Sequence, residues 1–522
     1  MNQIIETALN TLYLRQITTR DQLIREALRV ALTKEATAGS PDIDELFLNM
    51  KSATETKLGH FPADREDFYA IFSSLSAIDL FEFVSTVCEN DREGLSAAPE
   101  QLISYVCQQI TLCSPESVLI ADAEKCFGGL DAFIAASKGT VTLSTQNQLF
   151  FQLLLFLYRN NDQVLVRNVS IYAPLPQPEQ YDYIFCLPTF GGKLPPEDAN
   201  FLTRDYDGVA LENLLSLLSE DGTIDFIAPA KITFASGGYE KLRQKITDDF
   251  AVGQLMILPE GTFRPWTAIK TYFLSVCKKH GNAVRVGELS LHGKTLKPSK
   301  IKELAAAEFS GHADWRIELL LSDDDENLRR FRQSSTPKVK LREIAEVFRG
   351  KSILKKDTSI GDIGVLNISD MDAGEVAYDH MDTISEEERK VKRYELQDGD
   401  VLLSCRGTAA KTAVFTQQDF PIIASANIIV LRLKPGYVPG FVRLFLESPV
   451  GSVMLQSFQR GSGLMNLSPA DIMEMELPDL PEPEQEHIAQ DYKVENDRYR
   501  EAIAKAEKRM AEIKTQLFER MI

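Results

Sequence analysis

The residues best suited to chemistry lie in two turns, each of which ends a hydrophobic stretch. The stretch "SVLIA" ends at Asp122, and Gly128 and Gly129 follow it. The stretch "YDYIFC" ends in Leu187-Pro188-Thr189-Phe190. A glycine-rich turn after a strand allows a nucleotide cofactor to approach the backbone, and an aromatic ring in such a place can stack on a nucleic-acid base. The two turns together form a candidate site for a cofactor and a base.

Short β-rich runs carry these turns. Between about residues 96 and 335 they alternate with helical stretches, and the runs include "SVLIAD", "GTVTL", "QVLVRNV", "YDYIFCLP", "GTIDFIAP", "GQLMILP" and "IKTYFLSV". Such alternation is typical of a parallel sheet covered by helices on both faces. We therefore predict an α/β domain in this part of the chain.

Three further segments surround this domain. Residues 1–95 have apolar positions at helical spacing and predict a helical N-terminal domain. Residues 336–488 are richer in β signals separated by turns, and the charged and small residues of 319–338 mark the boundary before them. Residues 489–522 contain neither Gly nor Pro and predict one long helix. The predicted domains are thus 1–95, 96–335, 336–488 and 489–522.

Several motifs carry a resemblance to a known family. The middle segment contains "LPEGTFRPWTAIKTYFLSVCKK", and the C-terminal part contains "LREIAEVFRGKSI", "LQDGDVLLSCRGT", "IASANIIVLRL" and "LPDLPEPEQ". In these motifs the middle segment resembles the modification subunit of type I restriction-modification systems, and residues 339–522 resemble half of a specificity subunit. The resemblance implies a Rossmann-like methyltransferase domain at 96–335, a mixed α/β target recognition domain at 336–488 and a C-terminal coiled-coil helix at 489–522.

The cofactor motif of that family is degenerate in this chain. The family binds S-adenosylmethionine at Asp-Pro-x-x-Gly-x-Gly-Gly, whereas "IADAEKCFGG" places Glu124-Lys125 where a glycine belongs. Thr142 stands where the second strand should supply an acid for the ribose. We expect the bulky charged side chains to fill the methionine pocket, so that no cofactor binds. Asp122, Gly128 and Gly129 then mark a vestigial site, or simply a strand end and a helix start.

The base motif of the family is degenerate as well. Active adenine-specific members have Asn-Pro-Pro-Phe, in which the Asn accepts a hydrogen bond from the adenine amine and the aromatic ring stacks on the base. Here Leu187 takes the Asn position and has no acceptor, although Phe190 retains the ring. Pro188 and Thr189 complete the altered motif. We therefore expect no catalytic residues; the alternative is an active S-adenosylmethionine-dependent methyltransferase that tolerates these changes.

Basic residues beside glycines are the candidate DNA contacts of the C-terminal part. They occur in "FRGK", "CRGT" and "FQRGSG", where the backbone can come close to a phosphate or a groove edge. The candidates are Arg349, Lys351, Arg406, Lys411 and Arg460. Arg406 ranks first because arginine is the best bidentate reader of guanine and also pairs with phosphate. The alternative is that all five are ordinary solvated charges.

The final helix has a seven-residue apolar repeat. Steps of four and three residues place one set of side chains on a single seam. The seam consists of Tyr492, Asn496, Tyr499, Ile503, Ala506, Met510, Ile513 and Leu517. In the resembled family two such helices pack antiparallel, so a chain with only one of them is expected to form a homodimer. The alternative is that the helix packs on its own body or on another subunit.

The composition bears on metal binding, on the cellular compartment and on the charge of any DNA-binding surface. The seven cysteines include no Cys-x-x-Cys pair and the six histidines form no cluster, so we expect reduced thiols and no metal site. The longest apolar run, 149–158, is too short for a bilayer, and the N-terminus lacks a signal sequence, which predicts a cytoplasmic protein without membrane contact. The net charge of −19 requires any DNA contact to use a local basic surface.

These observations predict a sequence-specific binder of double-stranded DNA that is related to type I restriction-modification systems. An inactive methyltransferase domain would serve as its scaffold, with a homodimer and restriction-modification subunits as expected partners. Besides the active enzyme, the alternative is an acidic accessory or decoy subunit that binds restriction proteins without DNA.

Overall fold

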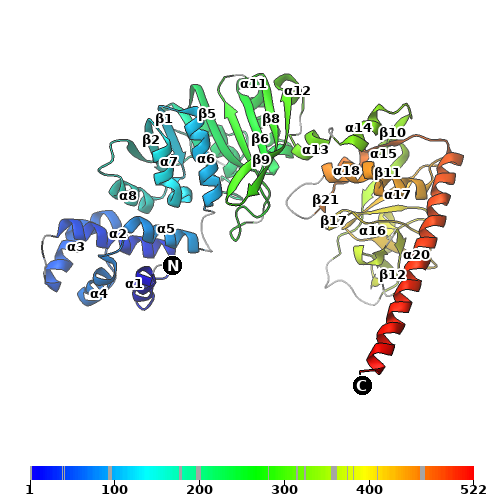
Figure 1. Ribbon diagram of the computed structural model, residues 1–522, viewed down its shortest axis with the longest axis horizontal. Helices are drawn as coiled ribbons and strands as arrows, with labels where there is room; N and C mark the ends of the chain where they lie inside the picture. The colour runs from blue at the N-terminus through cyan, green and yellow to red at the C-terminus, as the bar shows by residue number, and fades with distance from the viewer. Residues whose placement is uncertain are drawn as a thin grey trace. The chain divides into compact units, whose positions relative to one another are not determined.

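The computed structural model describes residues 3–521 except 38, 40–41, 92–96, 176–178, 196–200, 268, 280, 313–314, 323–324, 354–360, 373, 380, 408–409 and 459–464. The chain forms two compact units, unit 1 (Met1–Ile317) and unit 2 (Glu318–Ile522). Figure 1 shows the elements of each unit. The division lies just before residues 319–338, and the finer boundaries that the sequence suggests remain predictions.

Unit 1 begins with five helices. They are α1 (Gln3–Tyr13), α2 (Arg20–Ala36), α3 (Ile43–Leu58), α4 (Arg65–Leu75) and α5 (Leu80–Asn90). Four of them start at a side chain that accepts a hydrogen bond from a backbone N–H of the first turn: Thr19, Asp42, Asp64 and Asp79. Such caps satisfy the free donors of a helix start and fix where each helix begins. The sequence prediction of a helical N-terminal part is confirmed.

A nine-stranded sheet forms the rest of unit 1. Its strands are β1 (Ser117–Ala121), β2 (Thr140–Thr145), β3 (Val164–Asn168), β4 (Tyr181–Cys186), β5 (Leu218–Pro229), β6 (Ala251–Ile257), β7 (Thr271–Cys277), β8 (Ala283–His292) and β9 (Thr295–Ala305). Between them lie α6 (Glu100–Cys113), the 3-10 turn η1 (Ala123–Gly129), α7 (Leu130–Ala136), α8 (Gln148–Leu157), α9 (Tyr206–Leu215), α10 (Lys231–Phe234) and α11 (Gly238–Asp249), and α12 (Ala306–Ser310) follows β9.

The strand order is β3-β2-β1-β4-β5-β7-β6-β8-β9. The first five strands are parallel, as in a Rossmann-like sheet, and the order reverses between β1 and β4. Ligands of open α/β sheets bind at the carboxyl ends of the strands at such a reversal. The predicted α/β class is confirmed, but β7 runs antiparallel to β5 and β6, and the hairpin of β8 and β9 was not among the predicted strands.

The two parts of unit 1 pack on each other beside the turn after β1. The ring of Phe81, from α5, stacks on Phe127 of η1 with centroids 4.9 Å apart. The indole Nε1 of Trp266 donates to the carbonyl of Asp91 at 2.6 Å. The turn that carries the candidate cofactor motif is therefore held by apolar contacts from outside the sheet.

Unit 2 contains several small sheets with helices around them. The largest has the order β11-β20-β16-β18, and a second has β15-β12-β19. Its strands include β11 (Ala345–Arg349), β12 (Ile363–Leu366), β15 (Asp382–Ile384), β16 (Val401–Ser404), β17 (Arg406–Gly407), β18 (Thr412–Val414), β19 (Ile422–Ala424), β20 (Ile428–Leu433) and β21 (Met465–Asn466). Its helices include α14 (Glu326–Gln333), α17 (Pro439–Glu447), α18 (Pro449–Ser457) and α20 (Glu482–Glu519). This mixed architecture agrees with the predicted fold class.

Helix α20 is anchored at its start. The Gln485 side chain is fully buried, donates to the carbonyl of Leu480 at 2.7 Å and accepts from the backbone N–H of Val438 at 3.0 Å. From residue 501 onward every described side chain of the helix is exposed. The predicted seam residues Tyr499, Ile503, Met510, Ile513 and Leu517 are 38 to 65 % exposed. The far part of the helix therefore does not pack on the described body of its own unit, and dimerisation remains a prediction.

Within the described part of the chain, no single helix has both the length and the apolar composition needed to cross a membrane. Helices α4 and α5 meet that test only as a pair, bent by 98° at their junction.

Candidate functional site

Asp122 occupies the turn that follows β1 at the reversal of strand order. Its backbone is left-handed, with φ of 51°, and its side chain is only 2 % exposed. The carboxylate Oδ2 accepts hydrogen bonds from the amine of Lys125 at 3.0 Å and from the hydroxyl of Tyr172 at 2.5 Å. A buried carboxylate needs such partners, because without them the charged form is strongly disfavoured. Asp122 is thus engaged by the chain's own side chains.

Lys125 joins this turn to the loop that follows β4. Its side chain is 2 % exposed, and its amine donates to the Thr189 hydroxyl at 2.8 Å and contacts the Tyr172 hydroxyl oxygen at 3.3 Å. The backbone N–H of Thr189 in turn donates to the Tyr172 hydroxyl at 2.8 Å. We call Asp122, Lys125, Tyr172 and Thr189 the buried network. It spans the carboxyl ends of β1 and β4, where a Rossmann-like sheet places its ligand.

Tyr172 is the member of this network that the sequence did not reveal. It lies between β3 and β4 and packs its ring on Tyr206, with centroids 4.9 Å apart. Burial, followed by the neighbouring Asp122 carboxylate, raises the pKa of Tyr172 above its ordinary value. The hydroxyl therefore stays protonated and remains a donor to Asp122. No motif in the sequence marks a tyrosine at this distance from both turns.

Glu124 is a second buried acid in the same turn. The residue is 7 % exposed, and its Oε2 atom has no hydrogen-bond partner among the described residues. Burial first, and then the nearby Asp122 carboxylate, raise the pKa of Glu124 to about 7, while a hydrogen bond with Thr145 opposes this shift. A glycine belongs at this part of the turn in the resembled motif. The structure instead places two long ionisable side chains there, both turned into the protein.

The other motif positions have structural roles. Leu187 is fully buried in the hydrophobic core of unit 1. Phe190 is half-buried, and its ring lies edge-on to Phe263 with centroids 6.1 Å apart. A Cβ atom on Gly129 would lie 2.6 Å from the Ile103 side chain of α6, so close helix packing explains this glycine. The Leu187 position therefore offers no polar atom to a base.

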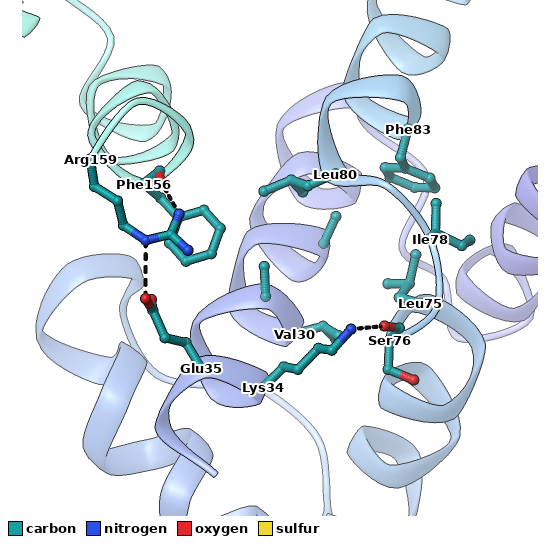
Figure 2. Close-up of a pocket in the computed structure, with 12 residues that line it drawn as sticks. Val30, Lys34, Glu35, Leu75, Ser76, Ile78, Leu80, Phe83, Phe156 and Arg159 are labelled. Carbon is teal, nitrogen blue, oxygen red and sulfur yellow. Dashed lines mark hydrogen bonds and ion pairs between the residues drawn. The ribbon is translucent and has the colours of Figure 1, made fainter. Parts of the chain in front are cut away.

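A cavity of about 420 Å³ lies elsewhere in unit 1, between α2, the junction of α4 with α5, and α8. Figure 2 shows its apolar wall and its two basic side chains. The amine of Lys34 donates to the Ser76 carbonyl at 2.7 Å, and Arg159 Nε donates to Glu35 Oε1 at 3.0 Å. The charged side chains of this cavity are thus already paired within the chain, and none of the predicted site residues lines it.

In unit 2 four of the five predicted DNA contacts lie at one end of the four-stranded sheet. Strand β11 ends at Arg349 and β16 ends at Ser404, while β20 begins at Ile428 and β18 begins at Thr412. The pairings of Arg349 with Ile429 and of Leu403 with both Ile429 and Thr412 place these four termini at the same edge. Residues 349, 351, 406 and 411 all lie at or next to these termini, although the sequence separates them by up to 62 positions.

These side chains differ in whether contacts within the chain already engage them. Arg349 donates to the Cys405 sulfur and to the Leu467 carbonyl, both at 3.0 Å, so its guanidinium is turned inward. Lys351 pairs with Glu386 at 2.9 Å, and this contact holds the pKa of the Glu386 carboxyl low, at about 2. The Lys411 amine donates to the Met371 carbonyl at 2.9 Å. Arg406 is exposed, and Arg460 lies outside the described residues.

The described residues contain no group of three or more His, Cys, Asp or Glu side chains that could hold a metal ion.

One region of unit 2 is similar to a known protein family. Residues 335–491 match the family described as "Type I restriction modification DNA specificity domain". Over 181 residues, which are 33 % of this chain and 36 % of the relative, the chain is 26 % identical to the "Type I restriction enzyme EcoEI methylase subunit" of Escherichia coli. The chain thus spans about a third of the length of this curated relative.

Among the solved structures that are similar to this chain, two illustrate the low identity of the matches. The type IIG restriction endonuclease BpuSI matches 92 % of this chain and 74 % of its own at 11 % identity, with a TM-score of 0.46. The type I restriction-modification methyltransferase subunit from Streptococcus thermophilus matches 54 % of this chain and 77 % of its own at 12 % identity, with a TM-score of 0.41.

Proposed function

We propose that this protein, a relative of type I restriction-modification subunits with a specificity domain at residues 335–491, is a sequence-specific DNA-binding protein whose methylase-like sheet is not catalytic. Unit 2 reads duplex DNA, and unit 1 serves as a scaffold. Helix α20 pairs two copies of the chain.

The buried network is the observation that carries this proposal. S-adenosylmethionine would have to enter at the turn after β1, and there the Lys125 amine already contacts Asp122, Tyr172 and Thr189. The ribose would need an acid at the carboxyl end of β2, but that strand ends at Thr145, which is fully buried. The predicted position, Thr142, lies in the middle of the strand and is 2 % exposed, so it offers no acid either. The residues present therefore do not fit the cofactor, and the proposed function includes no methyl transfer.

The base site supports the same conclusion. Transfer to an adenine amine requires an acceptor that holds the amine and makes it a better nucleophile. Leu187 has no such atom and lies in the core, so a flipped base would meet only the half-buried ring of Phe190. Stacking on that ring contributes affinity but no activation.

The edge of the four-stranded sheet supports DNA reading by unit 2. Arg406 is exposed at this edge. The residue before it, Cys405, is held in place because the guanidinium of Arg349 donates hydrogen bonds to the Cys405 sulfur and to the Leu467 carbonyl. A guanidinium on a fixed strand end can present its paired donors to a guanine or a phosphate. Two copies joined through α20 would present two such edges, related by a twofold axis, to two inverted half-sites.

Two measurements test the proposal on the full chain. Calorimetric titration with S-adenosylmethionine should give no heat of binding at submillimolar concentration. Selection from random duplexes should enrich paired, inverted half-sites. Binding of the cofactor or methylation of DNA would support the active-enzyme alternative. Failure to enrich any sequence, together with capture of restriction subunits in the presence of competing DNA, would support the decoy alternative.

The variant Leu187→Asn sharpens the first measurement. It restores the acceptor of the base motif, but it also buries an amide in the core, and the network remains in place. We expect no methyl transfer and a loss of about 2 to 4 kcal/mol of stability, whereas Leu187→Met should cost less than about 1.5 kcal/mol. Methyl transfer by Leu187→Asn would show that Lys125 does not block the cofactor.

A further inference from the structure

A strongly basic stretch of unit 1 has no part in the reading of DNA by unit 2. From Arg264 to Lys302 the sequence contains nine Lys and Arg residues and a single acid, Glu288, in a chain whose net charge is −19. Clustering of one sign in an acidic chain creates a local field that attracts the opposite charge. It also supplies the local basic surface that the overall charge demands of a DNA-binding protein.

The second half of this stretch contains the hairpin of β8 and β9, drawn in green in Figure 1. Ile257, the last residue of β6, pairs with Glu288, and β8 continues from there to His292. The tip of the hairpin thus extends past the carboxyl end of β6. Two lysines lie on this extension, Lys294 in the turn and Lys297 opposite Ser290. A third, Lys300, lies at the base of the extension, next to Ser299, which pairs with Glu288. We call these three the hairpin lysines.

The strands that carry the hairpin lysines are anchored in the hydrophobic core. Leu289 and Leu296 are 2 % and 3 % exposed and belong to the core of unit 1, so the strands that carry the lysines are anchored. By contrast, the side chains of Lys294 and Lys300 are 85 % and 71 % exposed. The Lys297 residue is exposed as well.

Neighbouring acids do not neutralise this surface. Lys300 pairs with Glu288 at 3.0 Å, and Lys294 lies 4.0 Å from Glu100. Such exposed ion pairs stabilise a protein little and exchange readily with solvent ions or with a competing anion. A phosphate group can therefore replace either carboxylate.

We propose that the hairpin lysines bind phosphates of duplex DNA, independently of sequence, at the carboxyl end of the unit 1 sheet. Lysine acts as a point charge on a flexible stem, which suits phosphate contact better than base readout. The turns after β1 and β4 lie at the same end of the sheet, so the duplex would pass the degenerate motifs without extruding a base. The inference rests on the proposed function in assuming that the chain binds duplex DNA, and it adds a second contact to it.

A different role for these lysines gives a different outcome. Strand β9 is the edge of its sheet, and lysine and proline on an edge strand prevent pairing with another chain. If edge protection were their only role, their replacement would promote self-association and leave DNA binding unchanged.

The test compares two triple variants of the full chain. One is Lys294→Gln, Lys297→Gln and Lys300→Gln. The matched control is Lys57→Gln, Lys138→Gln and Lys241→Gln, which changes three exposed lysines of unit 1 away from the hairpin. The probe is a fluorescent duplex of about 30 bp with a scrambled sequence, titrated by anisotropy at about 50 to 200 mM salt. Melting followed by circular dichroism verifies that both variants fold.

Each phosphate contact that is lost lowers the slope of log affinity against log salt by about 0.9. We expect the hairpin variant to lose about 2 to 3 in this slope and at least about tenfold in affinity at low salt, whereas the control keeps the wild-type values. Equal slopes for the hairpin variant and the wild type would overturn the proposal. It would also be overturned if the hairpin variant lost affinity for an RNA duplex in the same titration but kept its affinity for DNA.

Failure of the proposed function gives a separate signature. If unit 2 reads no sequence, selection from random duplexes will enrich none, yet the slope measured with the scrambled duplex will still change in the hairpin variant. If only the hairpin inference is wrong, the preference for selected sites will remain and the slope will not change.

Discussion

The Lys125 amine lies 2.8 Å from the hydroxyl oxygen of Thr189 and so connects the turn after β1 with the loop after β4. These two segments form opposite sides of the place where an open α/β sheet binds its ligand. A charged amine between them, 2 % exposed and also bonded to Asp122, is part of the folded core of this unit. The same contact that argues against a cofactor should therefore contribute to stability.

Removal of the Lys125 charge tests whether the buried network contributes to stability. In Lys125→Met the Asp122 carboxylate loses its buried cation, and we expect the free energy of unfolding to fall by about 3 to 5 kcal/mol. The double variant Asp122→Asn, Lys125→Met removes both charges and should recover much of that loss. Urea denaturation measures both values. The control Lys138→Met, at an exposed position, should change stability by less than about 0.5 kcal/mol. If Lys125→Met unfolded with the same free energy as the wild type, the network would contribute nothing to stability.

Glu124 predicts a dependence of stability on pH. Its folded-state pKa is raised to about 7, whereas the ordinary value is 4.5, so in this window the native state binds a proton that the unfolded state has released. Stability contributed by this group is therefore full at low pH, falls as pH rises from about 4.5 to about 7, and is constant above. Glu124→Gln should flatten this decline and stabilise the protein at pH 8 by, at most, roughly 3 kcal/mol.

Denaturation midpoints at several pH values measure this effect. Some decline between about pH 4 and 6 should persist in Glu124→Gln, because burial also raises the pKa of Asp225 to about 6. The control is Glu116→Gln, which removes an exposed carboxyl group from another part of unit 1. A steeper decline in Glu124→Gln than in the wild type would contradict the assigned direction of the pKa shift.

Arg406 and Arg349 should respond differently to truncation, although both lie at one edge of the four-stranded sheet. Arg406 is exposed, so Arg406→Ala should leave stability within about 0.5 kcal/mol and weaken DNA binding by about 1 to 3 kcal/mol, with relaxed preference at one position of the site. Arg349→Ala removes hydrogen bonds to Cys405 and Leu467 and should cost about 1 to 3 kcal/mol of folding stability.

Binding and unfolding are measured on the same two preparations. A loss of affinity that is equal for all sequences would assign Arg406 to phosphate rather than to a base. Unchanged binding by Arg406→Ala would remove it from the interface.

The seam of α20 predicts a dimer that charge can dissociate. Ile503→Glu with Met510→Glu places two charges on the exposed apolar seam, so we expect the sedimenting species to change from dimer to monomer and the fixed spacer between half-sites to disappear. The control Ala504→Glu with Ala511→Glu adds the same charge off the seam and should remain dimeric. A wild-type chain that sediments as a monomer would refute pairing through α20, even if unit 2 reads DNA.

The sequence by itself determined the α/β class, the positions of the strands up to β7 and the presence of a long final helix. The helix begins at Glu482, seven residues before the predicted start at 489, because Pro481 and Pro483 fit the start of a helix and do not exclude one. Hydrophobic periodicity is local, so runs such as "YDYIFC" predict a strand wherever that strand later lies. The loss of an acceptor at Leu187 and the charged pair at Glu124 and Lys125 were also visible, because they depend only on residue type. The apolar seam of α20 followed from spacing alone.

Tertiary structure decided which of these residues meet. Thr189 is 64 positions from Lys125, and Tyr172 is 47 positions from it, and only the order of β1 beside β4 brings all three together. The same is true in unit 2, where antiparallel pairing of four strands gathers residues 349, 406 and 411 at one edge and turns only the guanidinium of Arg349 inward. Local patterns cannot predict such contacts, because strand order and side-chain burial depend on how the whole sheet packs.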